Sequence, residues 1–382
     1  MLQAQILRPA ELSRRDRAAW AAFRAETEAF ASPLLSFEFA EAVARQRQDA
    51  AVAVFSRRGE PAGFLAHHRR PGGLGRPIGA PWSDYQALIA APGSAIDGME
   101  ALRAAGLQAF RFAGLIDPEG VFAEADSAGS EAYHIALAAS GEDYWESLRA
   151  ASPKRFKNMR RLEHKLAREM GEVVLVAPDH DPSAFERLLG WKSDQFRRSG
   201  LHDVLRPDWS RRFMLQLFET REGPLQGLLI TLRVAGRPVA GHFGVRMGDA
   251  YHPWIAAYDP ALAAYSPGLT FISEAIRAMP RIGLARYDLS AGSDHYKRPF
   301  ASAVTTVREG VARLGAPGLA PTLVRLSGLL GPRPADAVRR VERRLDHIAA
   351  VDLSFAGRVQ GIAQAIAASS RRLEAHAEYG AA

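Results

Sequence analysis

The chain has 382 residues, of which 47% are hydrophobic and 24% are charged, and it contains no cysteine. This composition is typical of a soluble globular protein with more than one domain, and the lack of cysteine excludes thiol nucleophiles, disulfides and thiolate metal sites. The formal net charge of +7 favours anionic partners such as nucleotides, coenzyme A or acidic lipids. We do not expect DNA binding, because 44 arginines against five lysines indicate a compositional bias of the whole chain.

The N-terminal segment MLQAQILRPAELSRRDRAAW carries charges every few residues and has no apolar core, so we expect no signal peptide. No uncharged apolar run approaches the length needed to cross a bilayer. We therefore expect a cytoplasmic protein, and we leave peripheral association with the inner membrane open.

Residues 1–140 predict a first α/β domain. The apolar periodicity indicates a strand at 3–7, helices at 15–26 and 37–47, a hairpin of 51–56 and 62–68, a helix near 98–107, and strands near 109–113 and 133–138. Helices interspersed with a hairpin recur in the second half, so we infer a tandem duplication of one fold.

The Gly/Pro-rich loop PGGLGRPIGAPWSDY of this first domain ends at Asp84 and Tyr85. A carboxylate beside an aromatic ring suits a sugar, since it accepts hydrogen bonds from hydroxyls while the ring packs on a pyranose face. The alternative is that Asp84 caps a turn after Trp82 and Ser83. We take Trp82, Asp84 and Tyr85 as candidate acceptor-binding residues.

The segment 141–170 contains the densest charge of the chain and predicts a helix. Between Arg149 and Arg168 there are eight basic residues and one acidic residue, while apolar residues recur at helical spacing at 156, 159, 162 and 166. The basic face, with Arg160 and Arg161, could bind a phosphate-bearing acceptor, a nucleotide or an anionic membrane surface. The alternative is an ordinary solvated helix face.

Residues 141–315 predict a second α/β domain. After a strand at 173–176 and a helix at 182–198, three strands at 227–235, 239–247 and 250–258 form a meander, and a helix from 267 leads to a strand at 286–290. A strand, a helix and a returning strand make a crossover, so the last strand should run parallel to the one that ends at Tyr258 and splay away from it.

The start of the predicted helix at Pro267 is a candidate anion site. Ser266 is a plausible N-cap, Pro267 fits the first helical position, and the free amides near Gly268 and Leu269 should point back over the strand end at Tyr258. A helix N-terminus of this kind can hold a pyrophosphate. It lacks a full glycine-rich phosphate loop, so the site should have fewer donors.

Residues 316–382 predict a helical extension of two or three helices. An apolar stripe at 338, 341, 345 and 348 faces arginines, and residues 321–382 carry a net charge of +3. The extension could pack on the domains, mediate oligomerisation, dock on a membrane or bind a regulatory cyclic dinucleotide through its paired arginines. Simple packing is the favoured interpretation.

Four phrases resemble the CelD-type acetyltransferases associated with cellulose and exopolysaccharide biosynthesis: GAPWSDY, AGHFGV, AAYDPALAAYSPG and YDLSAGSDHYKRPF. They occur in that family's order, and the resemblance covers the chain from about 30 to about 315. The family belongs to the FemAB-like branch of the Gcn5-related N-acetyltransferase (GNAT) superfamily.

The resemblance implies two tandem GNAT-like domains, each a mixed, mostly antiparallel sheet flanked by helices. It implies that 1–140 serves the acceptor and that 141–315 holds the acyl donor, acetyl-coenzyme A. The expected reaction is N-acylation of an amino sugar, or of its nucleotide- or lipid-linked precursor, for exopolysaccharide. Two alternatives stay open: aminoacyl-tRNA-dependent transfer to a peptide, and a degenerate acyltransferase that acts as a ligand-binding regulator of polysaccharide synthesis.

The candidate catalytic residues lie at and after the strand 286–290. Asp288 is the first choice for orienting or deprotonating the amine and His295 the second, Tyr296 could protonate the departing thiolate, and Lys297 suits an oxyanion or a phosphate. The resemblance supports Lys297, because HYKRPF matches the family motif whose lysine is important for transfer.

Two histidines fall in predicted strands of the second domain. His242 and His252 lie ten residues apart, which is a poor pattern for a metal site, so we expect no metal. A lone strand histidine is more often structural than catalytic. We take His242 as a candidate substrate contact.

Overall fold

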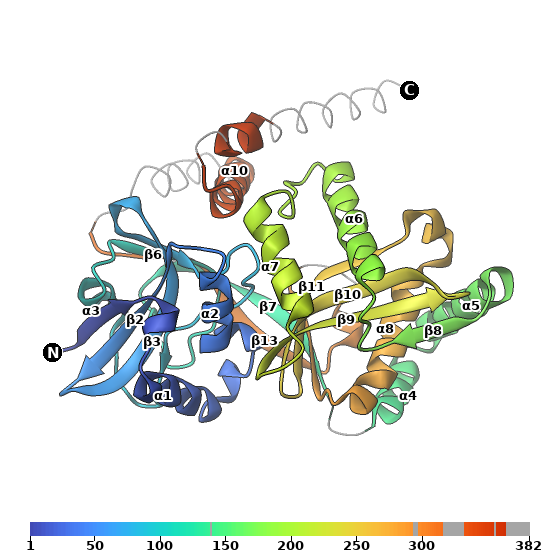
Figure 1. Ribbon diagram of the computed structural model, residues 1–382, viewed down its shortest axis with the longest axis horizontal. Coiled ribbons are helices and arrows are strands. Elements are labelled where there is room, and N and C mark those ends of the chain that lie inside the picture. Colours follow the sequence, from blue (N-terminus) through green and yellow to red (C-terminus); the bar gives the residue numbers. More distant parts are fainter. Residues whose placement is uncertain (138–139, 293–296, 316–331, 355–356, 364–382) are drawn as a thin grey trace.

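The computed structural model describes residues 1–137, 140–292, 297–315, 332–354 and 357–363 (Figure 1). The candidates His295 and Tyr296 therefore lie outside the described residues. Within them the chain forms one large mixed sheet with helices on its faces, and this arrangement confirms the predicted α/β class.

The sheet is built from strands of residues 1–140, here the first half of the chain, and of residues 141–315, here the second half. The strands are β1 (Gln3–Leu7), β2 (Ala50–Arg57), β3 (Glu60–Arg70), β4 (Leu74–Pro77), β5 (Ile89–Ala90), β6 (Ala109–Leu115), β7 (Asp126–Ala136), β8 (Val173–Val176), β9 (Leu225–Val234), β10 (Arg237–Met247), β11 (Ala250–Tyr258), β12 (Arg286–Ala291) and β13 (Ala303–Arg313). The helices are α1 (Arg14–Ala25), α2 (Phe37–Ala44), α3 (Gly98–Ala104), α4 (Gly141–Ala151), α5 (Pro153–Met170), α6 (Pro182–Arg198), α7 (Asp208–Glu219), α8 (Pro267–Ala278) and α10 (Pro332–Val351).

The two halves exchange strands at the centre of the sheet. The strand order is β1-β2-β3-β4-β6-β13-β7-β12-β11-β10-β9-β8, with β5 paired to β3. The late strand β13 therefore pairs with β6 of the first half, and the early strand β7 pairs with β12 of the second. The exchanged strands β13 and β7 also pair with each other in an antiparallel ladder. The predicted domain limits are not tested by this pairing, which crosses the limit at 140 and makes the sheet continuous.

The strands β11 and β12 are parallel and separate after a short contact. Their pairing is confined to Ala250–Tyr251 against Arg286–Tyr287, although β11 continues to Tyr258. This geometry confirms the predicted crossover and the predicted splay. Backbone groups along the rest of β11 consequently face a gap in the sheet rather than a neighbouring strand.

Helix α8 follows β11 and packs its apolar face into the core of the second half. The apolar repeat at 269, 272, 276 and 279 predicts this face: Ile272, Ile276 and Met279 are fully or almost fully buried, whereas Leu269 is half-buried. The helix begins where it was predicted, with Ser266 at the N-cap position and Pro267 at the first helical position. Ser266 lies in the left-handed region (φ 51°, ψ 53°), however, and its side chain makes no capping hydrogen bond. The amide of Leu269 donates to the carbonyl oxygen of Ser266 at 2.9 Å, which removes one of the expected free donors.

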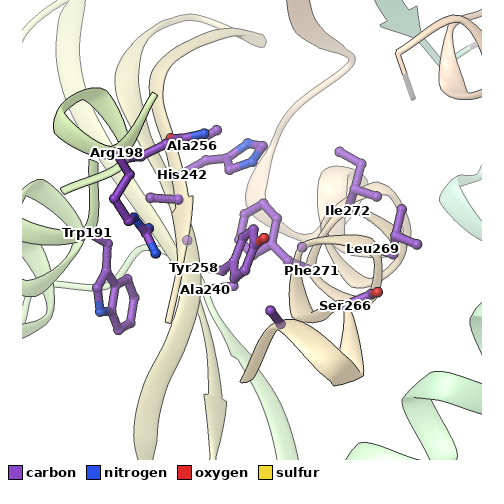
Figure 2. Close-up of a pocket in the computed structure, with 15 residues that line it drawn as sticks. Trp191, Arg198, Ala240, His242, Ala256, Tyr258, Ser266, Leu269, Phe271 and Ile272 are labelled. Atoms are coloured by element: carbon purple, nitrogen blue, oxygen red, sulfur yellow. The ribbon is translucent and has the colours of Figure 1, made fainter. Parts of the chain in front are cut away.

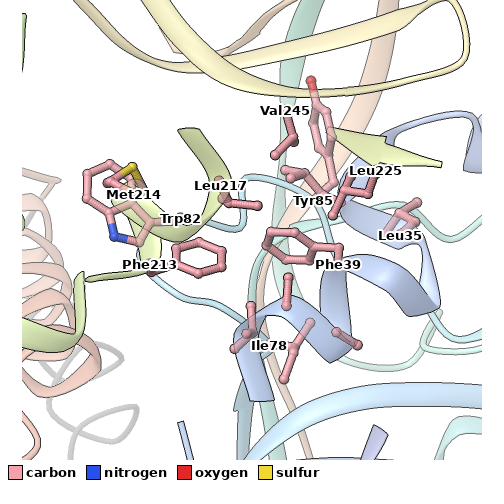
Figure 3. Packing of buried hydrophobic residues seen from close by; sticks show 14 of the residues in the cluster. Leu35, Phe39, Ile78, Trp82, Tyr85, Phe213, Met214, Leu217, Leu225 and Val245 are labelled. Carbon is pink, nitrogen blue, oxygen red and sulfur yellow. The ribbon is translucent and has the colours of Figure 1, made fainter. Parts of the chain in front are cut away.

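The two halves share a hydrophobic core (Figure 3). Phe39 of α2 packs against Phe213 of α7, with ring centroids 6.1 Å apart, and against Trp254 of β11 at 6.0 Å. Trp82 from the first half belongs to the same cluster and packs against Trp254, with ring centroids 6.3 Å apart. Because aromatic side chains from both halves fill one interior, the halves are held in a fixed relation.

The described part of the C-terminal extension packs on both halves. In Figure 1, α10 lies above the first half and beside α7. The indole of Trp209 on α7 donates to the carbonyl oxygen of Val351 at 2.9 Å, and Arg206 pairs with Asp352 at 3.1 Å. Arg76 of the first half pairs with Asp346 at 2.7 Å. No helix in the described ranges has the length and hydropathy of a membrane-spanning segment.

A bulge in β10 determines the geometry of the meander next to the site. The register with β11 shifts between Phe243 and Gly244, and a Cβ on Gly244 would lie 2.0 Å from the carbonyl oxygen of His252.

We predict that Gly244→Ala lowers the free energy of unfolding by about 2 kcal/mol, since the backbone must move. Urea denaturation would measure the change, with Gly129→Ala as the control. Gly129 lies in exposed β7 with open space around its Cβ position. Equal effects of both substitutions would contradict the proposed close approach.

Candidate functional site

The first cavity lies between α6, the ends of β10 and β11, and the start of α8 (Figure 2). Its volume is about 360 Å³. The predicted donor-binding residues Tyr258, Ser266, Gly268 and Leu269 are among its walls, whereas Pro267 is buried in the first turn of α8. The sequence pattern therefore located the neighbourhood of this cavity, because these residues are close in the chain.

Helix α6 supplies the wall that faces α8. Trp191 and Arg198 line the cavity, and Figure 2 shows the arginine side chain between Trp191 and Tyr258. Arg198 was missed as a site residue. Nothing in its local sequence shows that the end of α6 lies across from the start of α8.

The second cavity lies between the two halves and has a volume of about 570 Å³. Its walls come from β4, the loop at 80–84, β6, β11, β12 and α10. His242 and Ala256 line both cavities, so the two spaces adjoin at these residues. A molecule in the first cavity can therefore present one end to a molecule in the second.

A buried histidine connects the predicted carboxylates at the second cavity. The Nε2 atom of His252 lies 2.9 Å from Oδ2 of Asp84, which also accepts a hydrogen bond from Oγ of Ser290 at 2.7 Å. The His252 side chain is fully buried, whereas that of Asp84 is 34% exposed. Asp84 and Ser290 both line the cavity. Asp84 and His252 are 168 residues apart in the sequence, so no local pattern could have predicted their contact.

Asp288 completes this cluster from β12. Its Oδ1 atom accepts hydrogen bonds from the hydroxyl of Tyr85 and from the backbone amide of Ser290, both at 2.7 Å. Its Oδ2 atom lies 3.7 Å from Nδ1 of His252, which is too long for a hydrogen bond but close enough for an ion pair. A bulge between Asp288 and Ser290, with Ser290 at φ 62°, directs the serine to both carboxylates.

The cluster carries a protonated imidazole between two ionised carboxylates. Burial alone would lower the pKa of His252, but the charges of Asp288 and Asp84 and the hydrogen bond to Asp84 outweigh it and raise the pKa to about 9. Burial likewise opposes ionisation of Asp84 and Asp288, yet the imidazolium keeps the pKa of each carboxyl below its usual value. Burial and the Asp288 charge raise the pKa of Tyr85, so its hydroxyl stays protonated and donates.

The loop that carries Asp84 is held on β6 by a side chain. Gln86 donates from Nε2 to the carbonyl oxygen of Ser83 at 2.6 Å and accepts from the amides of Ala113 and Gly114 at 2.9 Å. A Cβ on Gly114 would lie 1.8 Å from the carbonyl oxygen of Asp84, so only glycine permits this approach. The backbone of the first half therefore holds the loop so that the Asp84 carboxylate lies next to His252.

His242 occupies the junction of the two cavities. Its Nδ1 atom lies 2.6 Å from the hydroxyl of Tyr287, and its ring packs on Phe271 with centroids 4.3 Å apart. Burial, together with the charge of Lys192, lowers the pKa of His242 to about 3. The imidazole is therefore neutral near neutral pH and can exchange a hydrogen bond with a reacting group.

Lys297 lines the second cavity, and its side chain is almost fully buried. The ammonium donates to the carbonyl oxygen of Ala291 at 3.0 Å. Its predicted position near Asp288 agrees with this location, since both residues line the same cavity. Its predicted role in transfer is not tested by the geometry.

Four predicted acceptor contacts lie away from the cavity walls. Trp82 is buried in the shared core and donates from its indole to Oγ of Ser210 at 2.8 Å. Arg160 and Arg161 are exposed on α5 and line neither cavity. Tyr85 is buried, with its hydroxyl engaged by Asp288, so its ring does not offer a face to a sugar. Trp254, which is half-buried, and the buried Phe112 do line the second cavity.

No group of three or more metal-ligating side chains comes together in the part of the chain that the structure describes.

The fold is shared with a solved structure of low sequence identity. The FemX structure has a TM-score of 0.51 and 10% sequence identity, over 80% of this chain and 96% of its own, and it shares the fold. A tandem GNAT protein from the clavulanic acid biosynthesis pathway has a TM-score of 0.47 and 11% identity, over 83% of this chain and 100% of its own. A conserved protein of unknown function from Bacteroides thetaiotaomicron has a TM-score of 0.49 and 12% identity, over 82% and 100%.

A family model matches part of the chain. Residues 153–298 match the family model described as an acetyltransferase (GNAT) domain. This part of the chain contains β8 to β12 and the first cavity, and it is the part that is similar to a GNAT acetyltransferase domain. A comparison of the sequence with curated proteins found no match.

The raised pKa of His252 predicts a pH dependence of stability. The folded protein holds the proton up to about pH 9, whereas an unfolded histidine loses it near its ordinary pKa of about 6.5. The stabilisation is complete below about pH 6.5 and is lost as pH rises through about 9, a loss of about 3 kcal/mol. Urea denaturation across this range should show that loss in the natural protein and not in His252→Gln.

The exposed His180 supplies the control for this experiment, because His180→Gln removes an imidazole outside the cluster. It should keep the pH dependence of the natural protein. If His252→Gln lost the same unfolding free energy between about pH 6.5 and pH 9, a group other than His252 would carry the proton responsible for the pH dependence.

Proposed function

We propose that this protein is an N-acyltransferase that moves an acyl group from acetyl-coenzyme A to the amino group of an amino sugar, or of its nucleotide- or lipid-linked precursor, in exopolysaccharide synthesis. The observation that carries the proposal is the meeting of two cavities at His242, one beside the start of α8 and one lined by Asp84 and Asp288. The GNAT match over 153–298 supports the acyl-transfer chemistry.

The first cavity suits a thioester donor. The start of α8 presents its positive dipole end, and Arg198 adds a full positive charge on the facing wall, which together favour a pyrophosphate. Apolar side chains such as Phe271 and Ile272 suit the uncharged arm of coenzyme A. The splayed end of β11 leaves backbone groups for that arm to bind, as an added strand would.

The second cavity suits an amine. Asp84 and Asp288 are ionised and line it, so they attract an acceptor ammonium and orient it toward His242. His252 is already protonated and cannot take the amine proton, so Asp84, the more exposed carboxylate, receives it on the way to solvent. The neutral amine nitrogen then forms the C–N bond with the thioester carbonyl carbon and loses a further proton. The C–S bond breaks, and the sulfur leaves as a thiolate that takes up one proton, so the proton lost by nitrogen balances the proton gained by sulfur.

The remaining groups have supporting roles in this proposal. Neutral His242 lies where the thioester carbonyl would enter from the first cavity and can donate a hydrogen bond to it. Lys297 contributes a positive charge on the same wall. Tyr296 stays a prediction as the group that protonates the thiolate. Trp254 offers the aromatic face for a sugar ring in place of Trp82 and Tyr85.

Donor binding is tested at Gly268. A Cβ there would meet nothing closer than a Tyr258 ring carbon at 3.8 Å, so a larger side chain can enter the first cavity without disturbing the core. Calorimetry should show acetyl-coenzyme A binding to the natural protein and to the control Gly129→Trp, but not to Gly268→Trp. Saturable binding of charged tRNA, with no heat from acetyl-coenzyme A, would instead favour the aminoacyl-tRNA-dependent reaction.

Transfer is tested at Asp84. Because the chain has no cysteine, a thiol reagent detects only the coenzyme A that is released. With glucosamine and UDP-glucosamine as probe acceptors, Asp84→Asn should lower the rate by about 100-fold, since it removes the charge and the base but keeps the shape. The control Asp194→Asn makes the same charge change in an exposed pair with Arg197 and should leave the rate unchanged.

Two outcomes of that assay would count against the proposal. Equal rates for Asp84→Asn and Asp194→Asn would remove the carboxylate cluster from the reaction. Donor binding without thiol release from any amine would instead favour a non-catalytic regulator.

A further inference from the structure

Two arginines stand side by side on the wall of the second cavity. The strands β4 and β6 are parallel, with Leu74 opposite Ala109 and Gly75 opposite Phe110. The next step in this register sets Arg76 opposite Arg111, with both side chains on the face away from Phe110 and toward the cavity. They are only 12% and 14% exposed.

A carboxylate from the C-terminal helix bridges this pair. Asp346 of α10 lies 2.7 Å from Nη2 of Arg76 through one oxygen and 2.6 Å from Nε of Arg111 through the other. Its backbone carbonyl oxygen also accepts from Arg76 at 3.2 Å. Asp346 itself lines the cavity, so its side chain occupies the position that a ligand of the two arginines would take.

The same wall carries a third guanidinium group. Asp346 offers one oxygen to each of Arg76 and Arg111, and Arg343, one turn earlier on α10, also lines the cavity and lies 3.9 Å from Glu309. A phosphate group carries nearly two negative charges and several acceptor oxygens, so it complements two forked guanidinium groups better than one carboxylate does.

We propose that Arg76 and Arg111 form an anion subsite of the acceptor cavity, which takes the phosphate of a phosphorylated or nucleotide-linked acceptor, and that Asp346 of α10 occupies this subsite until the phosphate displaces it. The term acceptor rests on the proposed function, but the subsite itself does not. The anion-binding role that the sequence suggested for Arg160 and Arg161 on α5 is thereby assigned to residues that line the cavity.

The proposal gives the second cavity two recognition elements. The loop at 80–84 and β12 present the carboxylates that hold an amine, while β4 and β6 present the arginines that hold an anion. An acceptor that carries both groups would engage both elements at once. Displacement of Asp346 would also loosen the contact between α10 and the first half, which Arg76 and Arg111 share.

The test is binding of inorganic phosphate to the full chain, measured by calorimetry without acyl donor. Asp346→Asn removes the competing charge and keeps the side-chain shape, so affinity for phosphate should rise by at least about tenfold. The control Asp194→Asn changes the net charge equally, away from the cavity, and should leave the affinity unchanged. Thermal unfolding checks that each variant is folded.

A double variant locates the bound phosphate. Adding Arg76→Gln to Asp346→Asn should abolish the gain, whereas adding Arg198→Gln, in the first cavity, should preserve it. An unchanged or lower affinity in Asp346→Asn would overturn the proposal, because the carboxylate would then not compete with the anion. A gain that survives Arg76→Gln and Arg111→Gln would also overturn it.

Two results would distinguish a failure of the anion subsite from a failure of the proposed acyl transfer. Phosphate binding with the expected pattern, but no thiol release from acetyl-coenzyme A, would retain the subsite and reject the reaction. Transfer to glucosamine and to glucosamine 1-phosphate with equal KM values, unaffected by Arg76→Gln, would retain the reaction and reject the subsite.

Discussion

The ion cluster around His252 is the constraint on which the rest of the site depends. An imidazolium with no exposed side-chain surface lies between Asp84 from the first half and Asp288 from the second. Removing one partner of a buried charge typically costs about 3–5 kcal/mol, so neither half can shift without a large loss of stability. Strand exchange between β6, β13, β7 and β12 supports the same arrangement through backbone pairing. The cluster therefore fixes the cavity that it borders, and its carboxylates stay ionised because the histidine stays protonated.

The separation of β11 from β12 gives the protein its two adjoining spaces. The pairing of the two strands stops after two residues, while β12 continues along β7 with a bulge at Ser290. The start of α8 and the end of α6 enclose the space beside β11, and the loop at 80–84 closes the other. His242 stands between them on β10. In the proposed reaction, the thioester carbonyl and the amine meet at this residue.

The features that could be predicted from the sequence are those formed by residues close together in the chain. The helix stripe of α8, the parallel crossover and the splay all follow from residues within 239–300, and four of the five expected donor-binding residues line one cavity for the same reason. Contacts between distant segments left no local trace. The halves must meet before β13 can pair with β6 or Asp84 can approach His252. The position of Arg198 opposite the start of α8 depends on how two helices of the second half pack. The left-handed Ser266 shows a similar limit, since a Ser-Pro sequence does not specify how the preceding turn enters the helix.

The distribution of charge in the second cavity narrows the kind of acceptor that the proposed function can use. Among the described residues, five basic and four acidic side chains line it: Arg76, Arg111, Lys192, Lys297 and Arg343, with Asp84, Asp288, Glu309 and Asp346. A polyanion such as tRNA needs a broad surface of one sign, because its affinity comes from many phosphate contacts. Here the two signs are nearly balanced, and the arginines of β4 and β6 lie on a different part of the wall from the carboxylates of the loop at 80–84 and of β12. Such a surface discriminates through geometry rather than through net charge. In the proposed reaction, a small molecule with an amine and an anionic group engages both regions, whereas a molecule with only one of these groups engages a single region.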